Sequence, residues 1–384
     1  MPKLGFVPSE RNAWCDCIRG YAILLVCIAH MLYLEPVHGW FPAITTFVKG
    51  DTGVYMFYVL SGFLVTGILV REVERNAAPD ARLRAIGRFF LRRIFRLQPS
   101  YILFLVFYGT FAQRHQEHPL SWFVLLIPMS NWFGGPYITW HIKTLHVEET
   151  YYVIIGLAAA AMRRSIRPLL LGLLIVAPLG RVALFVAGKL GGQVSFWVLD
   201  HYLPIEAFAV GGLLAQYWPG RLEKTRIVGA VTAHPAVSFV SALTALIAIA
   251  ALRDVKPFSY VLLFTWPLIF SVCSAIMIVS GLRNGDFVFG GESIRRLGVV
   301  SYTVYLFQQF ICGPWYETFG TPFSWLGWCA MTGGTLVLLP LWYSWVERPL
   351  TDLGARWFPR SQRVPAALDF SDERSKRGTS APAH

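Results

Sequence analysis

Long apolar runs alternate with short polar loops along the whole chain. About 20 apolar residues in a helix cross the hydrocarbon layer of a bilayer, so runs of this kind predict membrane-spanning helices. The chain is therefore predicted to be an all-α polytopic membrane protein with about ten transmembrane helices. The predicted spans lie near residues 18–36, 51–70, 99–113, 145–162, 168–188, 203–218, 234–252, 258–280, 299–318 and 323–346.

The positively charged residues indicate how these spans are oriented. Membrane proteins keep Lys and Arg in their cytoplasmic loops. With the N-terminus inside, most of the 34 Lys and Arg residues fall on the cytoplasmic side. Both termini are therefore predicted to be cytoplasmic, in a multi-pass protein of the cell (inner) membrane. We expect a cytoplasmic N-terminal segment (1–17), a transmembrane domain (18–350) and a cytoplasmic, disordered tail (351–384).

The composition excludes a soluble globular protein. The 384 residues are 55% hydrophobic and only 15% charged, with a mean hydropathy of +0.50, whereas an ordinary soluble domain has roughly 25% charged residues. The net charge of +12 follows from the basic cytoplasmic loops, so no nucleic-acid partner is expected. The six cysteines lack the spacing of a disulfide framework, and neither disulfides nor a metal site is predicted.

Two segments differ from the simple pattern of spans. Residues 119–142 are apolar and aromatic but are interrupted by Pro128, Gly134, Gly135 and Pro136. Such a segment is predicted to be re-entrant or interfacial and shielded by protein. The N-terminus begins polar, and no small-residue cleavage site follows its first apolar run, so no signal peptide is expected.

Ionisable residues within predicted spans are the first candidates for function, because the bilayer penalises them. Arg19 and His30 are eleven positions apart, which leaves a rotation of roughly 20° and a rise of about 16 Å along a helix. They are expected to share one face, with His30 near the middle of the bilayer if Arg19 lies at its cytoplasmic boundary. His30 would act as a general base, or would only bond to a backbone carbonyl of a neighbouring helix.

An acidic pair stands at the start of the fourth predicted span. Glu148 and Glu149 are adjacent, and adjacent helical residues point about 100° apart. At most one of the two carboxylates is therefore expected to face a cavity around His30, and both alternatives stay open. The pair could also be interfacial, with no chemistry. Glu206 and Asp200, near the sixth span, are weaker candidates.

Arginines gather in the second cytoplasmic loop. Their spacings of three and four place guanidinium groups along one helical stripe, formed by Arg88, Arg92, Arg93 and Arg96. Such a stripe binds phosphate through paired hydrogen bonds, or it only anchors the loop on the cytoplasmic side. The basic helix is predicted to end at Pro99, where the next span starts.

Six short motifs stand at the predicted spans. They are the Arg19/His30 pair, GVYMFYVLSGFLVT (53–66), RRIFRLQPSYI (92–102), TLHVEETYYV (144–153), SYTVYLFQQF (301–310) and VERPL (346–350). In this order they resemble the acyltransferase-3 family of integral-membrane O-acyltransferases, from Arg19 to Pro349. Three positions depart from the family's pattern, which suggests an acceptor pocket unlike that of the commonest members. Tyr55 stands where Asp is frequent, Lys143 where Trp is usual and Gln308 where His is common.

The resemblance implies transfer of an acyl group, most often acetyl from acetyl-CoA, to a hydroxyl of a carbohydrate or a natural product. Acyl-CoA would be a donor substrate, and no permanently bound cofactor is expected. His30 would remove the acceptor proton or be acylated itself, and Glu148 would be the catalytic carboxylate that orients its ring. The phosphates of CoA would be bound by Arg19, Arg92, Arg93 and Arg96.

Other functions fit the same sequence less well. The expected acceptor is a surface polysaccharide or glycolipid, with a macrolide-like secondary metabolite as the alternative. A secondary transporter of a glycan or lipid intermediate would also carry charged residues within the membrane, but the two halves of the chain show no visible similarity. A structural or receptor-like membrane protein would leave His30 without a role. The expected partners are acyl-CoA, the acceptor and the lipid bilayer.

Overall fold

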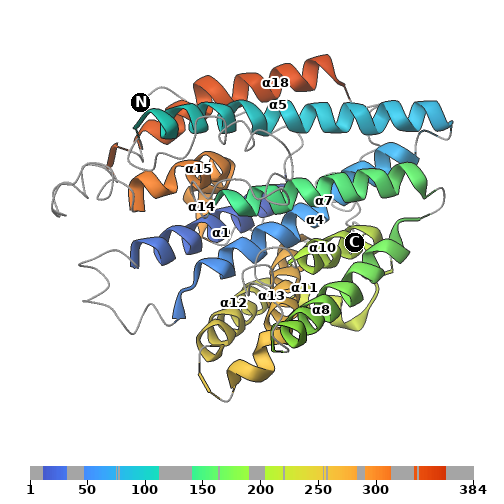
Figure 1. The fold of residues 1–384 in the computed structure, drawn as a ribbon, viewed down its shortest axis with the longest axis vertical. Helices are drawn as coiled ribbons and strands as arrows, with labels where there is room; N and C mark the ends of the chain where they lie inside the picture. Colours follow the sequence, from blue (N-terminus) through green and yellow to red (C-terminus); the bar gives the residue numbers. More distant parts are fainter. Residues whose placement is uncertain are drawn as a thin grey trace, which may run out of the picture.

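The computed structural model of the chain is an assembly of helices (Figure 1). It describes residues 12–32, 47–74, 76, 78–111, 141–162, 165–189, 204–218, 221–253, 255–256, 258–282, 290–312, 333–334 and 337–359. All regular secondary structure within these ranges is helical, in agreement with the all-α prediction. Most of the predicted re-entrant segment (119–142) and residues 360–384 of the predicted tail lie outside them.

The helices follow most of the predicted spans. They are α1 (Ala13–Leu32), α4 (Gly50–Glu74), α5 (Pro79–Phe111), α7 (Ile142–Ala161), α8 (Arg167–Lys189), α10 (Ile205–Tyr217), α11 (Arg226–Ala233), α12 (Pro235–Leu252), α13 (Phe258–Leu282), α14 (Gly291–Val299), α15 (Ser301–Cys312), the π-helix η2 (Tyr343–Glu347) and α18 (Arg348–Trp357). The first helix begins at Ala13, inside the predicted N-terminal segment.

Five helical stretches are long and apolar enough to cross a membrane, by length and composition. They are Ala13–His30, Gly50–Glu74, Arg167–Gly188, Pro235–Leu252 and Phe264–Leu282. This finding concerns the described residues, and several predicted spans fall partly or wholly outside them. The number of about ten spans and the cytoplasmic location of both termini therefore remain predictions.

Helix α5 differs from the prediction, because it does not end at Pro99. One helix covers residues 79–111 and joins the arginine-rich loop to the third predicted span. A proline inside a helix removes one backbone hydrogen bond. The carbonyl that loses its partner is that of Phe95, one turn before the proline. Near this point the Tyr302 hydroxyl of α15 donates to the Leu97 carbonyl (2.7 Å) and ties α15 to α5.

Helix α4 lies at the centre and packs against α1, α7, α10 and α13 (Figure 1). It crosses α10 closely because Gly62 lies against the Phe208 carbonyl and Gly211 against the Val59 carbonyl. Small residues let the backbones of two membrane helices approach in this way. A side chain at either glycine would meet backbone atoms. The crossing therefore fixes the position of α4 relative to α10.

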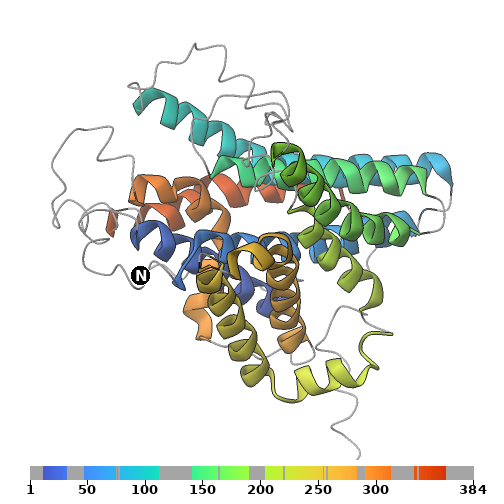
Figure 2. The ribbon, with the colours of Figure 1, turned by 60° about the horizontal axis from the view of Figure 1, so that its bottom comes forward.

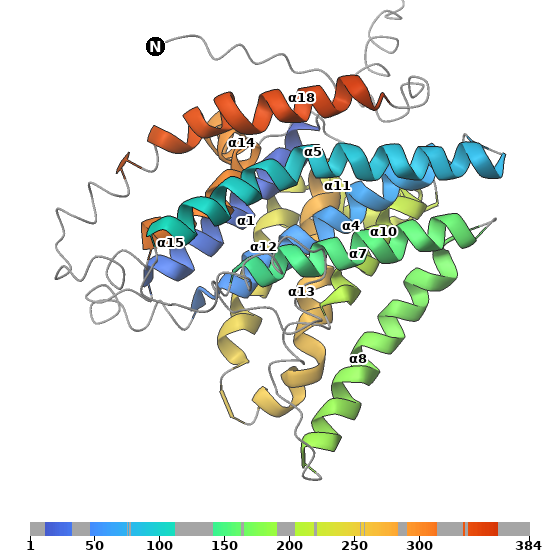
Figure 3. The same cartoon turned by 45° about the horizontal axis from the view of Figure 1, so that its top comes forward.

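The remaining helices lie on two sides of this centre. Helices α5 and α18 run side by side along one edge, whereas α8, α12 and α13 occupy the opposite side (Figures 1 and 3). Figure 2 shows the short α11 lying across the ends of the steeper α12 and α13. Helix α1 contacts the side formed by α8, α12 and α13, since Trp14 Nε1 donates to the Ile278 carbonyl of α13 (2.8 Å).

The C-terminal helix continues beyond the predicted transmembrane domain. The sequence predicts a disordered tail from residue 351, but α18 extends to Trp357. Phe95 of α5 packs against Trp357 and Phe358, with ring centroids 5.5 and 5.7 Å apart. Arg92 Nη1 donates to the Phe358 carbonyl (2.8 Å), where the negative end of the helix dipole favours a cation. These contacts order a segment whose polar sequence suggested disorder.

Candidate functional site

His30 lies in the last turn of α1, and the backbone fixes its ring. The imidazole Nδ1 lies 2.9 Å from the carbonyl oxygen of Val26, one turn earlier. A carbonyl oxygen only accepts hydrogen bonds, so Nδ1 carries the proton of the neutral ring. The lone pair is then on Nε2, the atom through which this ring would act as a base.

Residues of two other helices lie beside the imidazole. Gln308 of α15 is within hydrogen-bonding reach of it, and Asp51 of α4 acts on it electrostatically. Gly50 is also near, because a Cβ on this glycine would lie 3.9 Å from His30 Cε1. The surroundings of His30 are therefore formed by the end of α1, the first turn of α4 and the middle of α15.

The two glutamates of α7 contact different neighbours. Glu148 accepts hydrogen bonds from Ser61 Oγ of α4 (2.5 Å) and from the Tyr152 hydroxyl one turn later. Glu149 accepts one from Gln98 Nε2 of α5 (2.8 Å). Because the two side chains point about 100° apart, the pair ties α7 to the helices on both sides of it.

Glu148 and His30 lie at different heights along α4. Ser61, which donates to Glu148, is ten residues beyond Asp51, or about 15 Å along the helix. Within the described part of the chain, no hydrogen bond joins Glu148 to the imidazole. The orienting contact expected from Glu148 comes instead from a backbone carbonyl of α1. Tyr58 lies partway, since the charges of both Glu148 and Asp51 act on its hydroxyl.

Two arginines of the predicted stripe lie close to Tyr152, which also donates a hydrogen bond to Glu148. The Arg93 guanidinium carbon lies 5.1 Å from the ring centroid of Tyr152 and 5.6 Å from that of Phe89. Arg96 acts on the Tyr152 hydroxyl electrostatically, and the same hydroxyl donates to Glu148. Tyr152 is not among the residues predicted from the sequence. Its position four residues after Glu148 was the available signal, because that spacing places two side chains on one helix face.

The contacts of Arg92 support the alternative in which it only anchors the loop. Its Nη2 donates to the buried carboxylate of Glu72 in α4, and its Nη1 donates to the Phe358 carbonyl at the end of α18. Arg92 therefore joins three helices. Both terminal nitrogens of its guanidinium group already have protein partners.

Arg19 belongs to a charged cluster of α1 and α14. Its Nη1 pairs with Asp16 Oδ1 at 2.6 Å, and the charge of Asp16 also acts on Arg295 of α14. Hydrogen bonds from Arg295 and from Arg296 lower the pKa of Glu292 in this cluster to about 2. The contacts of the described residues do not connect Arg19 with the arginines of α5.

An ion pair and an aromatic cluster lie next to the surroundings of His30. Arg253 Nη1, at the end of α12, donates to Asp51 Oδ2 at 2.5 Å, and the guanidinium carbon lies 4.6 Å from the centroid of Trp266. Trp266 contacts Tyr55, with ring centroids 5.1 Å apart. The Asp51 side chain is 42% exposed. Aromatic rings with a few charged groups are typical of ligand sites, and Asp51 connects this group to His30.

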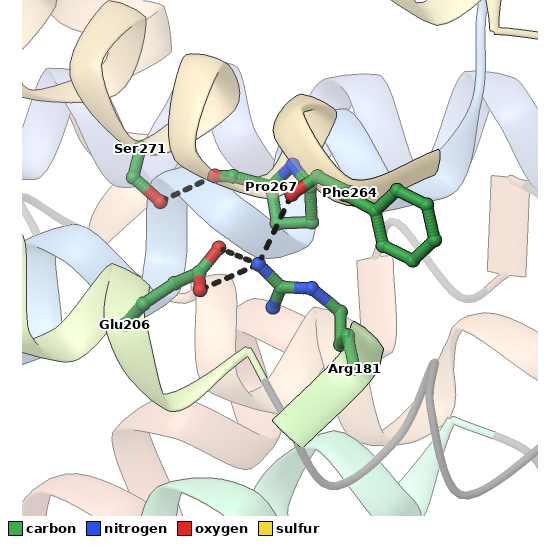
Figure 4. A network of polar contacts seen from close by, with 5 residues as sticks. All are labelled: Arg181, Glu206, Phe264, Pro267 and Ser271. Carbon is green, nitrogen blue, oxygen red and sulfur yellow. Dashed lines mark hydrogen bonds and ion pairs between the residues drawn. The ribbon is translucent and has the colours of Figure 1, made fainter. Parts of the chain in front are cut away.

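A buried ion pair ties α8 and α10 to the part of α13 that carries Trp266 (Figure 4). Arg181 Nη2 donates to both carboxylate oxygens of Glu206, at 2.7 and 2.8 Å. The same nitrogen lies 3.4 Å from the Phe264 carbonyl, two residues before Trp266. Pro267 follows in the same stretch of α13. The pair therefore supports a turn that contains a proline.

Glu206 is one of the two weaker candidates of the sequence analysis, and the other, Asp200, lies outside the described residues. Its partner Arg181 was not predicted, although an arginine within an apolar run signals a buried partner. The two side chains are 6% and 1% exposed. Within the described ranges, no three His, Cys, Asp or Glu side chains gather in a way that could hold a metal ion.

Comparison with known proteins identifies the family. A sequence model described as an acyltransferase domain, the acyltransferase-3 type, matches residues 12–343. The chain belongs to the acyltransferase-3 family. The match covers the helices that carry His30, Glu148 and the arginine stripe, so the predicted family is confirmed.

Several of the similar curated proteins are bacterial proteins named as O-acetyltransferases. YrhL of Bacillus subtilis (strain 168), provisionally named a peptidoglycan O-acetyltransferase, is 25% identical over 376 residues, which cover 90% of this chain and 56% of YrhL. The peptidoglycan O-acetyltransferase OatA of Listeria monocytogenes is 23% identical over 333 residues, covering 79% of this chain and 49% of OatA. The chain thus spans about half the length of these relatives. No solved structure matches the chain.

Proposed function

We propose that this protein is a membrane-embedded O-acyltransferase that moves an acetyl group from acetyl-CoA to a hydroxyl of an envelope carbohydrate. Two relatives carry the name of peptidoglycan O-acetyltransferase, which supports a glycan of the cell envelope as acceptor. The observation that carries the proposal is the His30 ring, whose Nδ1 is occupied by the Val26 carbonyl so that Nε2 holds the lone pair.

In the proposed reaction, His30 acts as the general base. Its Nε2 removes the proton of the acceptor hydroxyl while the hydroxyl oxygen attacks the carbonyl carbon of the thioester. The carbon–sulfur bond breaks when the tetrahedral intermediate collapses, and the imidazolium returns the proton to the departing sulfur of CoA.

The proposed donor path runs along the arginine stripe of α5. Arg93 and Arg96 bind the CoA phosphates, and Glu148 holds Tyr152 and thereby positions Arg93. The long pantetheine arm then covers the distance along α4 to His30. Arg19 and the basic residues of α14 add positive potential on the cytoplasmic side.

The acceptor is proposed to arrive at the opposite end of α4, at Asp51, Arg253 and Trp266. The exposed carboxylate of Asp51 can accept hydrogen bonds from sugar hydroxyls, and the guanidinium of Arg253 can donate to sugar oxygens. The distribution of Lys and Arg supports this direction, because it predicts a cytoplasmic N-terminus. The first span then runs outward, and the first turn of α4 lies on the outer side of the membrane.

The test measures acetate on envelope glycans. The protein is produced in a bacterial host without envelope O-acetylation, and base-released acetate is quantified from purified envelope glycans. We expect acetate with the wild type and with His234→Ala, a matched exposed histidine between α11 and α12, but none with His30→Ala at equal membrane abundance. A wild type that adds no acetate would overturn the proposed function. Full acetylation by His30→Ala would overturn the role of His30.

A further inference from the structure

The Gln308 side chain is fully buried in α15, and one of its two polar atoms has no partner. Its exposed fraction is 0%, and Oε1 lies 4.0 Å from the Cys27 sulfur. Among the described residues, Nε2 has no hydrogen-bond acceptor. Buried amide donors are almost always paired, because an unpaired one costs folding free energy. An apolar side chain of similar size would pack α15 against α1 without that cost.

The Gln308 side chain lies beside the turn of α1 that carries His30, the base in the proposed reaction. Gln308 is within hydrogen-bonding reach of the His30 imidazole, and Cys27 is on the turn before His30. His30 Nδ1 is bonded to the backbone, so Nε2 is the ring nitrogen left to act as the base. A donor next to a general base is where the oxygen of an attacked carbonyl comes to lie.

We propose that Gln308 is a catalytic residue whose amide Nε2–H stabilises the oxyanion formed during acyl transfer. The inference rests on the proposed function. When the acceptor oxygen bonds to the thioester carbon, the carbonyl electron pair moves to its oxygen, which accepts the hydrogen bond from Gln308. When the C–S bond breaks, the pair returns to the carbonyl, and the protonated His30 gives its proton to the sulfur.

A fixed donor of this kind acts mainly on the rate. It stays unpaired in the free enzyme and is used fully only when negative charge develops, so it stabilises the transition state more than the bound donor. Loss of such a donor is therefore expected to lower kcat and to leave the KM for acetyl-CoA nearly unchanged. A purely structural amide would instead change protein abundance, or kcat and KM together.

The experiment compares three substitutions at this position. Gln308→Met keeps the length but removes both polar atoms, Gln308→Leu removes them with a shorter branched side chain, and Gln308→His restores an N–H group. Ser301→Ala is the matched control, because Ser301 is another buried polar residue of α15, two turns earlier. Base-released envelope acetate is measured in cells, and kcat and KM for acetyl-CoA are measured in isolated membranes with lysozyme-digested peptidoglycan as acceptor.

We expect the Met and Leu variants to lose about 100-fold to 1000-fold in kcat, with the KM for acetyl-CoA within about twofold of the wild type. Gln308→His should recover a large part of the loss, and Ser301→Ala should behave as the wild type. A Met or Leu variant with kcat within about threefold of the wild type would overturn the inference while leaving the proposed function intact. A wild type without acetate in cells would overturn both. If the Met and Leu variants fail to accumulate, an abundant Gln308→His that is active would support the inference, and an inactive one would count against it.

Discussion

The Tyr152 hydroxyl donates a hydrogen bond to the Glu148 carboxylate one turn earlier in α7, while the guanidinium of Arg93 lies over the same aromatic ring. Ser61 of α4 is the second donor to Glu148. A carboxylate within the membrane is costly unless it is paired or hydrogen-bonded. Glu148 therefore couples α4 and α7 to the cation expected to bind the donor.

Removal of the Glu148 carboxylate should weaken donor binding. Glu148→Ala frees Tyr152 and Arg93, and the loss of a hydrogen bond to a charged group is worth about 1.5 kcal/mol, or about tenfold in affinity. We expect the KM for acetyl-CoA to rise by about tenfold, with a smaller change in kcat. Glu149→Gln, which changes the contact to Gln98 of α5, is the matched variant and should leave this KM within about threefold. A larger effect from Glu149→Gln would move the donor site to the α5 side of α7.

Arg92 and Arg93 are adjacent but should differ in what they affect. Arg92→Ala leaves the buried Glu72 carboxylate without its cation, and breaking a buried pair in this way costs about 3 kcal/mol of stability. Arg93→Ala should leave stability nearly unchanged and raise the KM for acetyl-CoA. Thermal unfolding in detergent and donor kinetics separate the two effects. Glu72→Gln in the Arg92→Ala background should restore part of the stability. A stable Arg92→Ala variant with weak donor binding would instead show that Arg92 binds the donor.

The apolar runs predict helices well where one run corresponds to one helix. Helices α1, α4, α8 and α12 lie close to their predicted spans because a buried or lipid-facing backbone must satisfy its own hydrogen bonds. The prediction is wrong at Pro99, because loss of one backbone hydrogen bond does not end the helix, which continues to Phe111. It is also wrong for residues 351–357, whose order depends on aromatic contacts with Phe95.

The sequence predicts which residues belong to the candidate site but not which of them contact one another. The motifs single out His30, Glu148 and Arg93, yet the expected contact between His30 and Glu148 is absent from the described residues. Helix periodicity places residues on faces but does not say at which height two helices meet. The Gln308 amide stands out only through its surroundings, because an unpaired buried atom cannot be recognised from sequence.

The ion pair between Arg181 and Glu206 should behave as a unit. Arg181→Leu or Glu206→Leu alone leaves a buried charge without its partner and should destabilise the protein by about 3–5 kcal/mol. The double variant Arg181→Leu with Glu206→Leu removes both charges, so its stability should lie much closer to the wild type than the sum of the single effects. Thermal unfolding of the four proteins in one detergent measures this coupling. Additive losses would contradict an isolated pair and would point to separate partners for the two side chains.

Arg253 provides a test of acceptor binding that leaves the donor side untouched. Arg253→Gln removes the charge that pairs with Asp51 and the cation over Trp266, both at the end of α4 opposite to the Arg93 contacts. Because a partly exposed pair contributes little to stability, the variant should accumulate normally. We expect the KM for lysozyme-digested peptidoglycan to rise by about tenfold, since one charged hydrogen bond is worth about 1.5 kcal/mol. The KM for acetyl-CoA should stay constant, and Arg253→Lys should retain part of the acceptor affinity. A rise in the donor KM instead would place the acceptor elsewhere and would assign the Asp51–Arg253 pair to the support of α4.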